Sequence, residues 1–258
     1  MSIRSVSRLA ACVALLPFAA HAHSPYLLPN TFDVSERDHV SVQASFTETF
    51  FVPDVVMKSE VWTVRTPDGR DQPLTATYTR DLAVLDVDTP AAGTYRISSG
   101  QREGRVAKAA LVDGDWKFLR DGDAAPAGGK VYDVRSLTCA EVYVSRGTPT
   151  DAALAPRGRG LEFQALTHPN RLLAGNEFRL KVLYDGKPLA GQAIAVTRAI
   201  EGGDASAPVT ITSAGDGVAT LKLAPGRYHA MLRHRVILPG SDARAESHTY
   251  ALTFEVAE

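Results

Sequence analysis

The sequence is poor in cysteine, in helical periodicity and in unbalanced charge. It has two cysteines in 258 residues, and its formal net charge at pH 7 is −1. A charge so close to zero gives no reason to expect binding to nucleic acid or to an anionic membrane. Motifs of the P-loop, Rossmann, G-x-S-x-G and H-E-x-x-H types are also absent, so none of these enzyme classes is indicated.

Long apolar runs are confined to one segment near the N-terminus. Arg4 and Arg8 flank the start of the run LAACVALLPFAA, which is too short to span a bilayer. Ala20 and Ala22 then supply small residues at the −3 and −1 sites of a signal peptidase, which predicts cleavage before His23. We therefore expect residues 1–22 to be a signal peptide. The mature chain should be exported, periplasmic and soluble, with no segment inserted in the membrane.

Cleavage at this point changes the charge and the cysteine count. It leaves 26 basic and 29 acidic residues, a formal charge of −3, and Cys139 becomes the one remaining cysteine. No intramolecular disulfide is then possible, so a packed core must hold the exported fold together. Cys139 lies in the run TCAEVYV and is interpreted as a buried, inert thiol; a metal-binding thiolate is the alternative.

Short runs with period-two alternation take the place of helical patterns. They predict strands at 39–46, 60–66, 82–88, 94–100, 161–167, 178–184, 192–199, 209–213, 218–223, 227–238 and 248–256. The runs at 209–213 and 218–223, separated by the turn sequence AGDG, predict a hairpin. The number and spacing of strands predict an all-β protein with two β-sandwich domains of immunoglobulin-like or prealbumin-like type.

Two stretches break the alternation. Residues 113–130 are polar and rich in glycine, and we expect a short hairpin with a surface loop, in which Trp116 caps the edge of a core. Residues 145–160 combine small residues with proline and glycine, which is typical of a linker. The predicted organisation is an N-terminal β-sandwich at 23–147, a linker at 148–160 and a C-terminal β-sandwich at 161–258.

A histidine at the mature N-terminus is a candidate metal ligand. The free amine and Nδ1 of His23 would together form a bidentate chelator for copper or nickel. Cleavage after Ala20 would instead place His23 third, as in amino-terminal copper and nickel motifs, but Phe18 at the −3 site disfavours that cut. The alternative is that His23 merely follows a cleavage site.

Two further histidines are predicted to meet. His234 shares its strand parity with apolar residues such as Leu232, and His248 shares its parity with Tyr250. If their strands pair, both side chains lie on one side of the sheet, so we predict His23, His234 and His248 as metal ligands. The opposite parity makes us expect His229 to be exposed. For each histidine, a structural role is the alternative.

Several segments resemble a known family. The mature start has His23 followed by an aromatic-Leu-x-Pro stretch. Together with the segment DGKPLAG at 185–191 and the last strand, YALTFEV, it is similar to a family of exported proteins with a domain of unknown function, often labelled NikM-like or nickel-uptake components. Family members commonly carry an acidic residue and a Phe-Trp pair directly after the histidine, whereas Ser24-Pro25-Tyr26 follow here. The resemblance implies β-sandwich domains and binding of nickel, cobalt or copper. It also implies an outer- or inner-membrane metal transporter as partner.

These patterns predict a periplasmic transition-metal-binding protein that is a carrier or an accessory to metal uptake, and not an enzyme. One alternative is a non-enzymatic interaction module of the cell envelope, in which the histidines are incidental. A second alternative is a copper enzyme with an N-terminal histidine brace, which would need an open coordination position and a substrate surface.

Overall fold

The computed structural model describes residues 23–200 and 206–258, so the predicted signal peptide lies outside the described residues. The described chain is all-β. It has two single-turn 3-10 helices, η1 (Ala152–Leu154) and η2 (Pro169–Arg171), and no α-helix. The predicted fold class is therefore confirmed. Within the same residues, no helix has the length and apolar character needed to cross a membrane.

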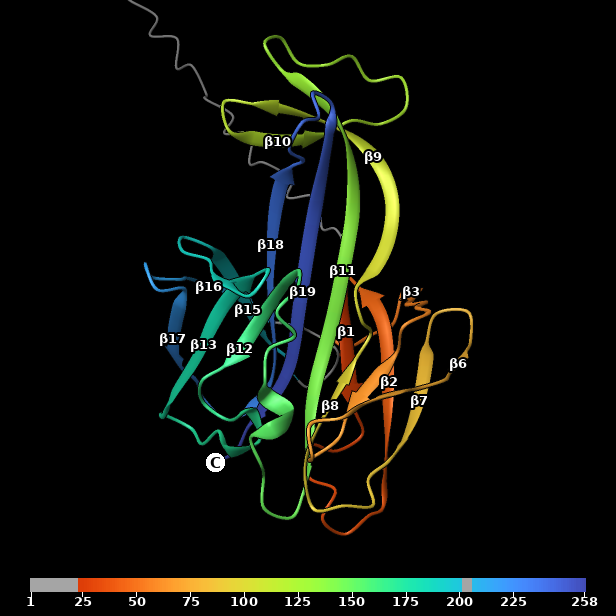
Figure 1. Cartoon of the computed structure of the whole chain (residues 1–258), viewed down its shortest axis with the longest axis vertical. Coiled ribbons are helices and arrows are strands. Elements are labelled where there is room, and N and C mark those ends of the chain that lie inside the picture. Colours follow the sequence, from red (N-terminus) through yellow and green to blue (C-terminus); the bar gives the residue numbers. More distant parts are fainter. Residues whose placement is uncertain (1–22, 201–205) are drawn as a thin grey trace, which may run out of the picture.

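The strands form three sheets (Figure 1). The N-terminal sheet contains β1 (Ser24–Pro29), β2 (His39–Thr47), β3 (Val55–Val56), β6 (Ala76–Tyr78) and β7 (Ala83–Asp88). The C-terminal sheet contains β12 (Leu161–Ala165), β13 (Glu177–Tyr184), β14 (Lys187–Pro188) and β17 (Val218–Lys222). The central sheet contains β4 (Thr63–Arg65), β5 (Asp71–Pro73), β8 (Gly93–Ser98), β9 (Arg102–Val112), β10 (Asp115–Phe118), β11 (Lys130–Arg146), β15 (Ala193–Arg198), β16 (Val209–Thr212), β18 (Gly226–Ile237) and β19 (Arg244–Val256).

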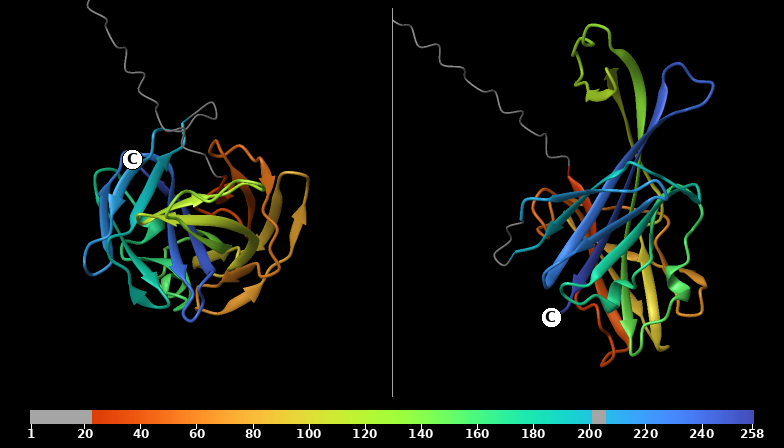
Figure 2. Two further views of the ribbon diagram at one scale, coloured as in Figure 1. Left: turned by 90° about the horizontal axis from the view of Figure 1, so that it is seen from above. Right: turned by 90° about the vertical axis from the view of Figure 1, so that its left-hand side faces the viewer.

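The central sheet is covered on both faces. Its middle strands, β11 and β19, run parallel and come from opposite halves of the sequence. Because successive side chains of a strand point to opposite faces, Tyr250 and Leu252 join the C-terminal hydrophobic cluster while Ala251 joins the N-terminal one. Viewed from above, the N-terminal strands lie on one side of these central strands and the C-terminal strands on the other (Figure 2). The apolar runs of β11 and β19 thus belong to strands buried on both faces.

The two hydrophobic clusters follow the predicted halves with few exceptions. Cys139 and Tyr143 pack in the C-terminal cluster although they precede the predicted linker, and the thiol of Cys139 is buried as expected. The linker segment is itself packed, because Ala153 in η1 is fully buried. The central sheet runs through both halves, and the predicted domain limits stay a prediction.

Two strand predictions need correction. The strand predicted at 60–66 is limited to β4. The hairpin predicted from 209–213 and 218–223 is wrong, because β16 pairs with β15 in the central sheet whereas β17 pairs with β13 in the C-terminal sheet. The turn between them carries the chain from one sheet to the other.

The long central strands extend beyond the two sandwiches as an arm (Figure 1). β9 and β10 form a hairpin there through Asp113 and Gly114, which have φ values of 50° and 90°. The ring of Trp116 lies 5.3 Å from that of Tyr132, and both cover a small cluster with Val134. Trp116 therefore caps the edge of a core, as predicted.

Candidate functional site

His234 and His248 lie directly opposite each other. They are paired residues in the antiparallel register of β18 and β19, and both point to the face of the central sheet that the C-terminal sheet covers. Directly opposed residues of antiparallel strands have Cβ atoms about 4.5–5.5 Å apart, so the two side chains are close neighbours. The predicted meeting of these two histidines is confirmed.

One ring nitrogen of each histidine already has a partner. His234 Nδ1 lies 3.2 Å from Gln192 Oε1, and His248 Nε2 lies 3.0 Å from Glu246 Oε2. An N–H donated to a carbonyl or a carboxylate leaves the other ring nitrogen with its lone pair, which is how metal-ligating histidines are usually oriented. Burial lowers the pKa of His234, and the neighbouring His248 lowers it further, so its ring is neutral at neutral pH.

Tyr184 reaches this pair from the end of β13. Its ring centroid lies 5.1 Å from the ring centroids of both His234 and His248, edge-on to each. Its hydroxyl oxygen is 3.4 Å from His248 Nε2. Burial raises the pKa of Tyr184, so this phenol is protonated at neutral pH. Two imidazoles, a phenol and a carboxylate therefore gather at one place, which we call the histidine pair site (Tyr184, His234, Glu246 and His248).

The structure does not bring His23 to this site. His23 precedes β1, and its Nδ1 lies 3.8 Å from Oε1 of Glu48. The start of β1 packs beside His229, whose Nε2 bonds to the carbonyl oxygen of Pro25. His229 and His234 are five residues apart in a strand with regular register, so they point to opposite faces of the central sheet. The predicted group of His23, His234 and His248 is therefore corrected, because the sheet lies between the first and the other two.

His229 also differs from its prediction. It was expected to be exposed, but it is 1% exposed, and its ring stacks on Phe50 with centroids 4.3 Å apart. We expected the residues of β18 that share the parity of His229 to face solvent. This is wrong, because the N-terminal sheet covers that face of β18. His168 precedes η2, where its Nδ1 accepts a hydrogen bond from the backbone N–H of Asn170.

A strict metal cage is not present in the described residues. Across 23–200 and 206–258, no group of three or more His, Cys, Asp and Glu side chains is arranged to hold an ion. The histidine pair site supplies two imidazoles with one carboxylate, and the ring of Tyr184 contacts both imidazoles. Imidazole and carboxylate are donor types that nickel, cobalt and copper accept, but the described residues form no group of three of them around one point.

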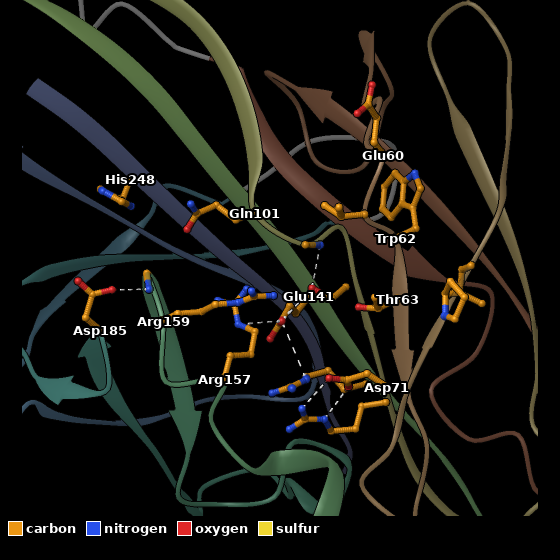
Figure 3. A pocket seen from close by; sticks show the side chains of 18 of the residues that line it. Glu60, Trp62, Thr63, Asp71, Gln101, Glu141, Arg157, Arg159, Asp185 and His248 are labelled. Atoms are coloured by element: carbon orange, nitrogen blue, oxygen red, sulfur yellow. Dashed lines mark hydrogen bonds and ion pairs between the residues drawn. The ribbon is translucent and has the colours of Figure 1, made fainter.

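A cleft of about 950 Å³ opens beside this site. Figure 3 shows Trp62 and Glu60 on one wall and His248, Arg159 and Asp185 on the other, with Glu141 and Arg157 between them. One wall comes from the N-terminal half of the chain and the other from the segment after β11 and from the C-terminal half. Sequence patterns did not indicate this cleft, because its residues lie in unrelated elements and share no motif.

The floor of the cleft is a buried network of charges around Glu141, which is 1% exposed. Its Oε1 lies 3.6 Å from Arg157 Nε and 4.0 Å from Arg96 Nε, and it accepts a hydrogen bond of 2.9 Å from Ser98. Tyr250 donates to the other carboxylate oxygen. Burial acts to raise the pKa of Glu141, but Arg157, Arg96 and these donors outweigh it and hold the pKa below its usual value.

Arg157 connects this network to two other buried groups. Its Nη1 lies 3.0 Å from Cys139 Sγ, and its backbone N–H donates to Glu162 over 2.8 Å. Burial raises the pKa of the Cys139 thiol, so the sulfur stays protonated at neutral pH. An arginine from the predicted linker is therefore a structural part of the cleft floor. The sequence did not predict this role, because the glycine and proline residues around Arg157 are typical of an exposed linker.

The fold and this cleft define an all-β protein of two facing sandwiches with a histidine pair at the edge of the cavity between them. The chain belongs to the family described as "Domain of unknown function (DUF4198)", whose model matches residues 20–236. The match supports the expected resemblance to a family with a domain of unknown function, and the NikM-like, nickel-uptake label stays a prediction. No curated protein sequence matches the chain.

Two solved structures are similar to the chain at low level. One is a tetra-tandem repeat in the extending region of a large adhesion protein, with 12% sequence identity and a TM-score of 0.23. The match covers 91% of this chain and 49% of that structure's chain. The chain thus spans about half the length of that structure. The other consists of the three N-terminal domains of the Highly Immunogenic Outer Capsid protein of bacteriophage RB49, with 12% sequence identity and a TM-score of 0.20. The match covers 92% of this chain and 100% of that structure's chain. Neither score supports an argument about function.

Proposed function

We propose that the protein binds a transition-metal ion, nickel, cobalt or copper, in the periplasm through His234 and His248, as a carrier or an accessory to uptake. The observation that supports this most directly is the opposed position of the two imidazoles in the β18–β19 register. Because the paired strands already hold the two nitrogen donors close together, less conformational entropy is lost when an ion binds.

The surroundings of the pair favour this proposal over a purely structural role. Gln192 and Glu246 orient the rings from outside, as outer-shell partners do in metal sites. The donors that the pair offers are therefore two imidazole nitrogens, and water or a further ligand would have to complete the coordination of the ion. A low-pKa, neutral His234 needs no proton release before it binds a metal at neutral pH.

The experiment is isothermal titration of the purified exported protein with nickel, cobalt and copper. We expect one ion per chain, and His234→Ala or His248→Ala should each weaken binding at least tenfold, since each removes one of the few donors. His39→Ala is the matched control, because His39 is exposed, lies on β2 of the N-terminal sheet and bonds to its neighbour Asp38. Absence of binding by the wild type would overturn the proposal and favour the envelope interaction module.

His23 is tested separately from the histidine pair. Intact mass of the exported protein determines whether the chain begins at this residue, as the sequence predicts. His23→Ala should leave binding at His234 and His248 unchanged, because the central sheet separates them. If His23→Ala removes binding while the pair variants retain it, the metal is bound by the terminal amine and imidazole beside Glu48, and our assignment of the pair is wrong.

A further inference from the structure

Arg233 and Arg235 are two half-buried cations on the part of β18 that extends into the arm. Neither forms an ion pair with an acidic side chain of residues 23–200 or 206–258. Arg233 Nε donates to the hydroxyl of Thr249 over 3.1 Å, whereas the Nε of Arg235 is buried without a hydrogen-bond partner among the same residues. Because buried polar groups are normally hydrogen-bonded and buried charges are normally paired, these two groups point to a missing anion.

The face of the arm that carries the two arginines has no carboxylate beside them. Across this face, β19 and β11 present only small hydroxyl side chains next to the arginines. Arg102 of β9 lies at the far end of the same row, and its Nε donates to the backbone carbonyl of Lys58 and not to an acid. The face therefore has three cations and no acidic group around a floor of hydroxyls: Ser247 and Thr249 on β19, and Ser136 and Thr138 on β11.

This face of the arm is curled inward. β18 and β10 are its outer strands, with β19, β11 and β9 between them. Even so, Cζ of Arg235 lies 5.5 Å from the ring centroid of Phe118 on β10. Figure 1 shows the hairpin of β9 and β10 crossing toward the end of β18. Arg233 and Arg235 thus lie on an inner face, which a small molecule can reach more easily than a flat surface such as a bilayer can.

The two guanidinium groups repel each other. Burial lowers the pKa of both Arg233 and Arg235, and the charge of Arg233 lowers the pKa of Arg235 further, with no acid acting in the opposite direction. Arginine nevertheless stays protonated in proteins, so both positive charges persist at neutral pH. An anion between the two groups would remove this repulsion and supply an acceptor for the free Nε.

We propose that the inner face of the arm binds a small phosphate-bearing molecule, whose phosphate group lies between the guanidinium groups of Arg233 and Arg235. A phosphate dianion matches two adjacent cations better than a single carboxylate does, and each guanidinium can bind two of its oxygens. The rings of Trp116 and Phe118 provide an apolar surface for the rest of the molecule. This inference is independent of the proposed metal site, because His234 and His248 point to the other face of the same strands.

The test is equilibrium dialysis of the purified exported protein with radiolabelled inorganic phosphate at low ionic strength, with phenyl phosphate as competitor. Wild type should bind one phosphate per chain, and Arg233→Gln and Arg235→Gln should each weaken binding at least tenfold. Phenyl phosphate should compete at least as well as phosphate does. Arg135→Gln is the matched control and should bind as wild type does, because Arg135 lies on the opposite face of the arm and pairs with Glu103.

A second measurement separates binding from folding. In chloride buffer Arg235→Gln should be no less stable than wild type, since it removes an unpaired charge. Phosphate should then raise the melting temperature of wild type and of Arg135→Gln more than that of Arg235→Gln. Equal affinity of Arg135→Gln and Arg235→Gln for phosphate, or binding of succinate as tight as that of phosphate, overturns the inference. Binding to phosphatidylglycerol vesicles without binding of phosphate or phenyl phosphate also overturns it, and would make the arm a lipid-binding surface.

Discussion

At the residue scale, single glycines permit the sharp turns that join the sheets. Gly217 has a φ of +80° and ends the turn between β16 and β17, where the chain changes sheet. Its carbonyl oxygen accepts a bond of 2.8 Å from the backbone of Val182. A Cβ at this position would lie 2.8 Å from Val182 O and 3.1 Å from Leu189 N. Both contacts are backbone atoms within the C-terminal sandwich, so they cannot move aside as a flexible side chain would.

Gly217→Ala should therefore destabilise the protein by more than the cost of placing alanine at a positive φ, because the added methyl group also meets the backbone. Gly175→Ala is the matched control, because its φ is +77° and an added Cβ meets nothing within 4 Å. The control should lose about 1–2 kcal/mol, the cost of a left-handed non-glycine residue, and Gly217→Ala roughly 2 kcal/mol more. Urea unfolding measures both free energies. Equal losses would show that the turn relaxes around the methyl group.

At the element scale, the sequence predicted what alternation can show. The parity of His234 and His248 placed them together because both belong to regular strands. The same parity argument failed for His229, since it assumed that one face of β18 meets solvent. The continuous apolar runs in β11 and β19 indicate that both faces of the central sheet are buried, because a strand buried on both faces need not alternate. Those runs could have corrected the expectation that His229 is exposed. Nothing local could indicate that β16 and β17 join different sheets, or that Arg157 in a glycine-rich segment is buried.

The network around Glu141 joins elements that are distant in sequence. Glu141 is on β11, Ser98 on β8 and Tyr250 on β19, and Arg157 comes from the segment after η1. Glu141→Gln removes the charge but keeps the shape, which leaves two buried guanidinium groups with less compensation. We expect a loss of about 3 kcal/mol in the free energy of unfolding, as for breaking a buried ion pair.

The control for this variant is Glu255→Gln on β19. Its pair with Arg227 is 3.2 Å long, and both side chains are more than 40% exposed, so it should cost less than about 1 kcal/mol. Thermal or urea unfolding gives both values. If Glu141→Gln costs no more than Glu255→Gln, the buried charges do not stabilise the contact between the two halves. The number of unfolding transitions also tests whether the predicted domains unfold as one unit.

At the scale of the whole molecule, buried titratable groups make the fold sensitive to acid. Burial lowers the pKa of His229 to about 4, although the bond to Pro25 acts in the opposite direction, and burial also lowers the pKa of His168. A histidine that must stay neutral in the folded state takes up a proton more readily when unfolded. Its stabilisation is thus complete above the ordinary pKa of 6.5 and is lost as the pH falls toward 4. Glu141, whose pKa is lowered, adds a second loss below about 4.5.

The acid sensitivity should depend largely on His229, because this residue fixes β1 and its N-terminal sheet against β18. For wild type we expect the free energy of unfolding to fall by about 3 kcal/mol between pH 7 and pH 4 from this residue alone. The glutamine in His229→Gln cannot gain a proton. The free energy of unfolding of this variant should be lower than that of wild type at pH 7, but it should change less between pH 7 and pH 4. Urea unfolding at intervals of half a pH unit measures the two slopes, with His39→Gln as the exposed control. Parallel slopes for wild type and His229→Gln would mean that other groups control acid unfolding, and that the contact between β1 and β18 survives protonation of this ring.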